Sequence, residues 1–199
     1  RHTRYISVTG VQTCALPIYP RFVSAVDKGN VVSYKAAYER LMGPTDRTHI
    51  SEFTLLDAMK DAGIPFYAGV DWGYVHDSVI CIVAMLPDGE IWLMETYAAP
   101  GLEFDDFLEI AKSFRDKYNV QKWFVDQAMP GHVKSFNKNG MKSPKFTKDV
   151  LGGIESVRAK IVNSAGKRQF KVINNDANKK AISAIVKHRF RSEEHTSEL

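Results

Sequence analysis

The sequence predicts an α/β protein with a mixed β-sheet, in which three antiparallel strands are followed by parallel strands and helices flank the sheet. Two apolar runs, 78–86 (SVICIVAML) and 91–98 (IWLMETYA), are joined by the turn sequence PDGE, a pattern typical of a hairpin. A short strand pattern, FYAGVD, precedes this hairpin at 66–71. After residue 104, helix and strand patterns alternate, which favours parallel strands joined by helical crossovers.

The N-terminal part of the chain contains two predicted helices. Residues 33–42 begin with Ser33 as a possible N-cap and stop at Gly43, and residues 51–62 begin with Ser51 and stop at Gly63. Outside these helices no strong core pattern is present. We therefore expect residues 20–64 to be a connector, or the tail of an upstream domain.

The patterns become stronger from residue 66 onward. The continuous apolar run at 78–86 predicts a strand buried on both faces. Helical periodicity of apolar residues predicts an amphipathic helix over 104–118, with its apolar face formed by Phe104, Phe107, Leu108, Ala111, Phe114 and Tyr118. The other predicted elements are strands at 120–127 and 170–174 and helices at 130–139, 147–162 and 177–189. Two glycines at 152–153 each cost a helix roughly 1 kcal/mol, which favours close backbone packing or a later helix start.

The two ends of the chain are expected to lie outside the fold. The sequences VTGVQTCALPI at 8–18 and RSEEHTSEL at 191–199 back-translate to one oligonucleotide read in opposite orientations. This pattern resembles a sequencing-library adapter translated in frame, so we expect residues 1–18 and 191–199 to be adapter-derived. A signal peptide is disfavoured because residues 1–18 lack a clean apolar region and a small-residue cleavage site.

Composition excludes several classes of protein. The 199 residues allow about one domain. Two cysteines cannot build a disulfide scaffold, and no CxxC pair suggests zinc. No apolar run approaches the ~18 residues of a transmembrane helix. We therefore expect a protein with no membrane partner.

Charge is unevenly distributed along the chain. Residues 20–133 carry 10 Lys/Arg and 17 Asp/Glu, a net charge of −7, whereas residues 134–190 carry 14 Lys/Arg and 3 Asp/Glu, a net charge of +11. The asymmetry is compatible with a carboxylate-rich site beside a polyanion-binding surface. It is equally compatible with ordinary surface charge that happens to cluster.

Two aspartates end matching strand patterns. Asp71 follows the run YAGV and Asp126 follows KWFV. If these strands are parallel neighbours, both carboxylates emerge at one sheet edge about 4.8 Å apart, and they repel unless a cation lies between them. Oxygen ligands of this kind suit Mg²⁺ or Mn²⁺, and two such ions can activate a water and stabilise the leaving oxygen of a phosphodiester. The alternative is that each Asp is only a turn former or helix cap.

A run of lysines follows the second aspartate. It consists of Lys134, Lys138, Lys142, Lys145 and Lys148 and contains no acidic residue. Lys134 and Lys138 share one helical face at i, i+4, where like charges repel unless an anion lies opposite. This spacing predicts contacts with a nucleic-acid backbone, and a solvated surface is the alternative.

Together these motifs resemble the C-terminal nuclease domain of phage terminase large subunits, which has an RNase H-like fold. The resemblance spans residues 66–190 and rests on GVDWG at 69–73, VDQAMP at 125–130 and the helix containing DVLGGIESV at 149–157. It implies that Asp71 and Asp126 are catalytic, metal-binding residues of an endonuclease that cuts double-stranded DNA during genome packaging with two Mg²⁺ or Mn²⁺ ions. It further implies the host cytoplasm as location, and the terminase small subunit and the portal protein as partners.

The resemblance also marks what this chain lacks. The family's third carboxylate follows the last helix in a motif like DHALDALRY, and none precedes Arg191. We therefore expect a C-terminally truncated domain with weak or no cleavage activity. Residues 20–64 would be the tail of the family's upstream ATPase domain, whose P-loop motif GxxxxGK[ST] does not occur in this sequence.

Several further residues have weaker claims. Glu95 ends the third strand and is a possible metal ligand, although a solvated strand-end glutamate is the favoured interpretation. Asp149 is interpreted as a charge at a helix start. His76 and Asp77 are interpreted as loop residues and His132 as an exposed helix-start residue. Cys81, Trp72 and Trp123 are predicted to lie in or beside the core.

Two other functional classes remain open at this point. GVDWG also fits the phosphate loop of an actin-like sugar or acid kinase, but that class needs a second Gly-rich phosphate loop and an adenosine motif, and neither is visible. A non-catalytic DNA-binding module is the other alternative, because the third carboxylate is missing.

Overall fold

The structure is a computed structural model that describes residues 29–146 and 149–187, so the two adapter-like ends lie outside the described residues. Its elements, in chain order, are β1 (Val31–Val32), α2 (Tyr34–Met42), α3 (Glu52–Asp61), β2 (Phe66–Asp71), β3 (Ser78–Met85), β4 (Ile91–Ala99), α4 (Phe104–Tyr118), β5 (Lys122–Val125), α5 (Pro130–Lys138), α6 (Val150–Ile161), β6 (Phe170–Ile173) and α7 (Lys179–Lys187). From Phe66 onward, the order of strands and helices is the predicted one.

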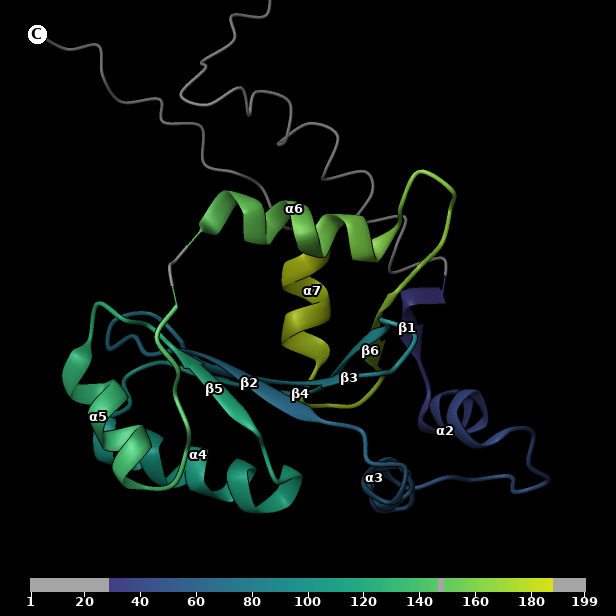
Figure 1. Cartoon of the computed structure of the whole chain (residues 1–199), viewed down its shortest axis with the longest axis horizontal. Helices are drawn as coiled ribbons and strands as arrows, with labels where there is room; N and C mark the ends of the chain where they lie inside the picture. The colour runs from purple at the N-terminus through teal and green to yellow at the C-terminus, as the bar shows by residue number, and fades with distance from the viewer. Residues whose placement is uncertain (1–28, 147–148, 188–199) are drawn as a thin grey trace, which may run out of the picture.

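A single mixed sheet organises these elements (Figure 1). Its six strands lie in the order β1-β6-β4-β3-β2-β5. β2, β3 and β4 are antiparallel neighbours, whereas β5 is parallel to β2, and β6 is parallel to both β4 and β1. This arrangement confirms the predicted fold class of three antiparallel strands followed by parallel strands with helices around them.

The two faces of the sheet are covered unequally. α4 and α5 lie on one side, here called the α4 face, and α6 and α7 lie on the other, the α6 face (Figure 1). Along β3, side chains on the α4 face are fully buried, while Val79, Cys81 and Val83 on the α6 face are only partly buried. The prediction that this strand is buried on both faces is therefore wrong for the α6 face.

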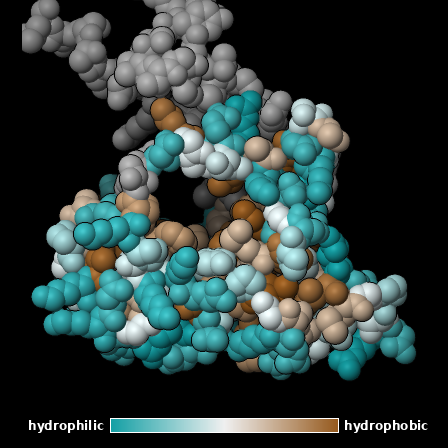
Figure 2. Space-filling model, viewed as in Figure 1, coloured by the Kyte–Doolittle hydropathy of each residue, from teal (hydrophilic) through white to brown (hydrophobic). Residues whose placement is uncertain are grey.

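A cavity accounts for the incomplete cover of the α6 face. It has a volume of about 660 Å³ and lies between β3 and β4 on one side and α6 and α7 on the other. Its lining includes Cys81, Thr96, Val157 and Phe170. Figure 2 shows the molecule hollowed beneath α6.

The main core lies on the α4 face. The predicted apolar face of α4 packs there, with Phe107, Leu108, Ala111, Phe114 and Tyr118 all buried. Trp92 of β4 and Trp123 of the edge strand β5 are also fully buried in this layer. Because hydrophobic stabilisation scales with the apolar area removed from water, this layer is the main source of it.

The segment before β2 packs against the same core. Both predicted helices form, and the side chains of Ser33 and Ser51 accept the N–H groups of Ala36 and Thr54 as N-caps. Leu55 and Met59 of α3 are fully buried. β1 extends the sheet beyond β6, so residues from 30 onward share buried contacts with the elements that follow residue 66.

The start of α6 explains the paired glycines. Asp149 is the N-cap and accepts the N–H of Gly152 at 2.9 Å, so α6 begins at Val150, and residues 147–148 of the predicted helix lie outside the described residues. A Cβ atom at Gly152 would collide with the Asp149 carboxylate, whereas one at Gly153 would meet nothing within 4 Å. Only the first glycine is therefore required by close packing.

No helix in the described part of the chain is long and apolar enough to span a membrane.

Candidate metal and nucleic-acid site

The register of β2 and β5 brings Asp71 and Asp126 together. Val70 pairs with Val125 in the parallel ladder, so the next residue on each strand, Asp71 or Asp126, lies at the same level of the same sheet edge. Neighbouring strands are about 4.8 Å apart. The predicted juxtaposition of the two backbones is therefore present in the structure.

Both aspartates belong to the α6 face. On β2, Phe66, Ala68 and Val70 are buried toward α4, which leaves Asp71 on the opposite, exposed phase. On β5, the side chains of Trp123 and Val125 are buried on the α4 face. Because side chains alternate between the two faces of a strand, Asp126 lies on the same exposed face as Lys122 and Phe124. The pair thus lies on the side of the sheet that helices cover least.

The backbone after β5 fixes the position of Asp126. Its Oδ1 accepts the N–H of Ala128 at 3.0 Å, and its carbonyl accepts the N–H of Met129 at 3.2 Å. Pro130 then begins α5, where its missing N–H costs nothing. Asp126 is therefore a turn former as well as a member of the pair, and the two roles are compatible.

An aromatic cluster is formed by Trp72, Phe104 and His132. It lies next to the segments that carry Asp71 and Asp126. The imidazole of His132 stacks on Phe104 with ring centroids 3.8 Å apart, and the Trp72 ring meets His132 edge-on at 4.8 Å. Burial lowers the pKa of His132, which favours the neutral ring. His132 is therefore a packing residue rather than the exposed helix-start residue that its position suggested.

The cluster links the two segments that carry Asp71 and Asp126. Trp72 directly follows Asp71, and His132 lies in the first turn of α5 after Asp126. Phe104 begins α4 and joins both. Sequence reasoning missed this link, although a Trp and a His shortly after two matched aspartates were a usable signal.

The structure does not bring Glu95 to the pair. Glu95 lies opposite Ile82 of β3, a residue of the buried α4 face, whereas Asp71 lies opposite Val79 on the α6 face. Its carboxylate contacts Lys117 Nζ at 2.6 Å and accepts the Tyr118 hydroxyl at 2.7 Å.

Glu52 completes this ion-pair network. It contacts Lys117 Nζ at 2.7 Å and accepts the Tyr118 hydroxyl at 3.2 Å. Burial alone would lower the pKa of Lys117, but hydrogen bonds to Glu52 and Glu95 outweigh it and raise the pKa above its usual value. Burial first, and then the charge of Glu95, raises the pKa of the Tyr118 hydroxyl far above its usual value. The network thus ties α3 to α4 and β4.

The lysines divide between two places. Lys134 and Lys138 are exposed on α5, which lies on the α4 side of the sheet (Figure 1). Lys142 and Lys145 are exposed on the segment that follows α5. The carbonyl of Lys142 accepts the N–H of Trp123 at 2.8 Å, so this segment lies against the outer edge of β5. Lys148 lies outside the described residues.

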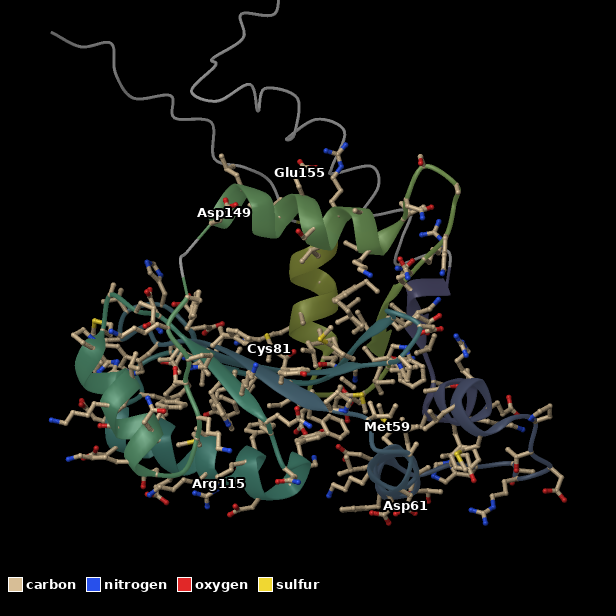
Figure 3. The ribbon with its side chains drawn as sticks, viewed as in Figure 1. Met59, Asp61, Cys81, Arg115, Asp149 and Glu155 are labelled. Carbon is tan, nitrogen blue, oxygen red and sulfur yellow. The ribbon has the colours of Figure 1, made fainter. Side chains whose placement is uncertain are left out.

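The remaining candidates lie elsewhere. Asp149 caps α6, well separated in Figure 3 from the sheet edge. Asp77 pairs with Lys180 of α7 at 3.2 Å. Cys81 lies beneath α6 and α7 in Figure 3, where it is partly buried and lines the cavity rather than the main core, and burial raises the pKa of its thiol.

The donor set can be tested against a divalent cation. Two carboxylates on adjacent strand ends fit one Mg²⁺ or Mn²⁺ ion, since these ions are often held by one or two carboxylates while keeping several waters. Within residues 29–146 and 149–187, no cluster of three or more His, Cys, Asp or Glu side chains could hold a metal ion. The pair therefore fits a first ion, and the described residues supply no complete cage for a second.

Comparison with known proteins gives matches only among solved structures. No protein-family model matches the sequence, and no curated protein sequence does. The nuclease domain of the large terminase from bacteriophage SPP1, solved with bound Mn, is 10% identical with a TM-score of 0.55, over 83% of this chain and 82% of that domain.

The large terminase of a thermophilic bacteriophage gives similar matches in different crystal forms. One is 15% identical with a TM-score of 0.55, over 83% of this chain and 36% of that protein. Another is 18% identical with a TM-score of 0.52, over 63% of this chain and 32% of that protein. The chain thus spans about a third of the length of this terminase. At these identities the likeness establishes the fold, and the described residues have the RNase H-like fold of the nuclease domain of phage large terminases.

Proposed function

We propose that this chain is part of a metal-dependent endonuclease domain of a phage terminase large subunit, which cleaves double-stranded DNA during genome packaging. The observation that carries the proposal is the in-register placement of Asp71 and Asp126 on adjacent parallel strands, on the less covered face of a terminase-nuclease fold. Mg²⁺ and Mn²⁺ are the proposed cofactors, because both donors are carboxylate oxygens.

The chain's own groups have defined tasks in this proposal. Asp71 and Asp126 hold the cation, which supplies a polarised phosphoryl oxygen and an activated water when bound. The Ala128 N–H and the start of α5 hold Asp126 in place, and the Trp72–His132 contact couples this turn to the end of β2. Lysines near the edge neutralise phosphate charge without reading sequence.

The further assignments belong to the same proposal. Residues 66–190 form the nuclease domain, and residues 20–64 connect it to an upstream ATPase domain. Double-stranded DNA, the terminase small subunit and the portal protein are the proposed partners, in the host cytoplasm. A third carboxylate would follow the last helix.

The test is metal binding and cleavage by the chain. We expect isothermal titration to detect Mn²⁺ binding that Asp71→Asn and Asp126→Asn each weaken at least tenfold, and plasmid cleavage to be weak or absent. Glu103→Gln, an exposed carboxylate change at the N-cap of α4, is the matched control. Mn²⁺ affinity that neither aspartate variant changes would contradict the assignment of the pair.

A second function rests on the incomplete donor set. A DNA-binding module without cleavage fits two carboxylates that have no third ligand among the described residues. Strong Mn²⁺-dependent cleavage that Asp71→Asn abolishes would exclude this second function. It would also show that a third ligand is not required.

A further inference from the structure

A polar cleft lies at the opposite end of β5 from the aspartate pair. It has a volume of about 920 Å³ and lies between the C-terminal ends of α4 and α5 and the start of β5. Its lining includes Arg115, Asp116, Gln121, Lys122, Lys142 and Ser143. Arg115, labelled in Figure 3, projects from α4.

The cleft carries an excess of positive charge. Arg115 is already engaged, because its guanidinium donates to Asp116 at 2.7 and 3.1 Å and to the carbonyl of Asn139 at 2.6 Å. The last contact offsets the negative end of the α5 dipole. Lys122 and Lys142 are exposed, and neither has an ion pair with any residue that the structure describes. Two ammonium groups on one cleft repel each other unless an anion lies between them.

A buried hydroxyl lies in the same lining. Ser143 is 9% exposed, and its Oγ has no hydrogen-bond partner within residues 29–146 and 149–187. Its backbone N–H is satisfied by Asn137 Oδ1 at 3.0 Å, so the orphan group is the hydroxyl alone. A buried hydroxyl without a partner is unfavourable, and a ligand oxygen could satisfy it only if the Ser143 side chain turned toward the cleft.

β5 connects this cleft to the aspartate pair. The side chains of Lys122, Phe124 and Asp126 lie on the same face of β5, and Phe124 is 39% exposed. The four residue steps from Lys122 to Asp126 span about 13 Å at ~3.3 Å per residue. One DNA strand advances about 3.4 Å per nucleotide along the axis, so this span corresponds to about four nucleotides.

We infer that the cleft binds a phosphate of the DNA backbone about four nucleotides from the phosphate at Asp71 and Asp126, with Lys122 and Lys142 as its cationic ligands. The exposed edge of β5 would then guide one strand of the DNA from the cleft to the aspartate pair. This inference rests on the proposed function, but it assigns DNA contact to Lys122 and to a cleft that the lysine pattern alone did not indicate. Lys134 and Lys138 do not line this cleft and make a smaller contribution.

The experiment measures binding of a short DNA duplex in EDTA, so neither metal nor cleavage enters. Association constants are recorded against salt concentration for the wild type, Lys122→Ala, Lys142→Ala and the double variant. Each lost phosphate contact makes the slope of log K against log salt shallower by about 0.9, so the double variant, which loses the one phosphate held by both lysines, should have a slope shallower by about 0.9. Lys122→Arg should keep the wild-type slope.

Lys60→Ala, an exposed change at the end of α3, is the control and should leave the slope unchanged. Wild-type binding with an unaltered slope in the double variant would overturn the inference and leave the proposed function standing. No DNA binding by the wild type would overturn both.

A parallel NMR titration separates the two sources of phosphate. The amide signals of Lys122 and Ser143 should shift with duplex DNA at concentrations where inorganic phosphate has no effect. Equal shifts with inorganic phosphate, together with an unaltered salt slope, would mark a small-anion site and overturn the inference.

Discussion

The ring of His132 lies flat on the ring of Phe104, with centroids 3.8 Å apart and an interplanar angle of 10°. This contact holds the first turn of α5 against the first residue of α4, and the edge of Trp72 closes the cluster from β2. The two segments that carry the aspartates are thus joined through the packing of these rings. Truncation of His132 therefore tests how far the geometry of the pair depends on the cluster.

His132→Ala should weaken Mn²⁺ binding and destabilise the fold. An aromatic pair contributes about 0.5–1.5 kcal/mol beyond its buried area, and the loosened α5 start shifts Asp126 relative to Asp71. His132→Phe keeps a stacked ring and should restore Mn²⁺ affinity. Urea denaturation and calorimetric titration measure the two effects. If Ala and Phe weaken Mn²⁺ binding equally, the imidazole itself, and not the stacking, is what matters.

Stability should also depend on the protonation of His132. Burial lowers its pKa in the folded state, so the unfolded state binds more protons as the pH falls. The contribution of the neutral ring is fully present above the unfolded pKa of about 6.5 and is lost as the pH falls through the lower folded value. Denaturation between neutral and mildly acidic pH should show the wild type losing more stability than His132→Phe. If the free energy of unfolding changes with pH in the same way in both proteins, the protonation of His132 does not affect stability.

The aspartate pair should oppose folding when no cation is bound. Two carboxylates on strands about 4.8 Å apart repel by roughly 1 kcal/mol in a water-like dielectric. Asp71→Asn should therefore raise the melting temperature in EDTA, while the wild type alone gains stability when Mg²⁺ is added. Differential scanning calorimetry with and without Mg²⁺ measures both changes. A variant that is less stable than the wild type in EDTA would argue against mutual repulsion.

The ion-pair network around Lys117 should be a structural anchor. Lys117→Met leaves Glu52 and Glu95 facing each other without the ammonium between them, and should cost about 1–3 kcal/mol after allowance for partial exposure. Lys112→Met breaks a surface pair with Glu109 on the same helix and should cost less than about 1 kcal/mol. Urea denaturation of both variants provides the comparison. Equal losses would show that the network adds nothing beyond a surface pair.

The strong features of this fold were readable from the sequence because they are local. The apolar run before Asp71 and the matching run before Asp126 define strand ends without any tertiary information, and the turn at Asp88 and Gly89 defines the hairpin. Placing both acids at one edge required only the assumption that the strands are parallel neighbours. That assumption holds because β5 pairs with β2.

The weaker features depend on long-range packing. The pairing of β3 with β4 shifts register between Ile82 and Val83, so the face that Glu95 occupies cannot be counted from the strand end. β1 has two residues and carries no periodicity. The stacking of His132 on Phe104 joins residues 28 positions apart, and no local pattern encodes it.

The two glycines of α6 offer a matched pair of substitutions in adjacent residues. Gly153→Ala should stabilise the protein by about 0.5–1 kcal/mol, because alanine is the better helix former and its Cβ meets nothing within 4 Å. Gly152→Ala gains the same propensity but displaces the Asp149 carboxylate that accepts its N–H. Loss of an N-cap costs about 1 kcal/mol, so the net change should be near zero or destabilising. In the background of Asp149→Ala the clash and the cap are both absent, and the two glycine substitutions should then stabilise equally. Unequal effects in that background would show that a contact other than the one with Asp149 disfavours a side chain at position 152.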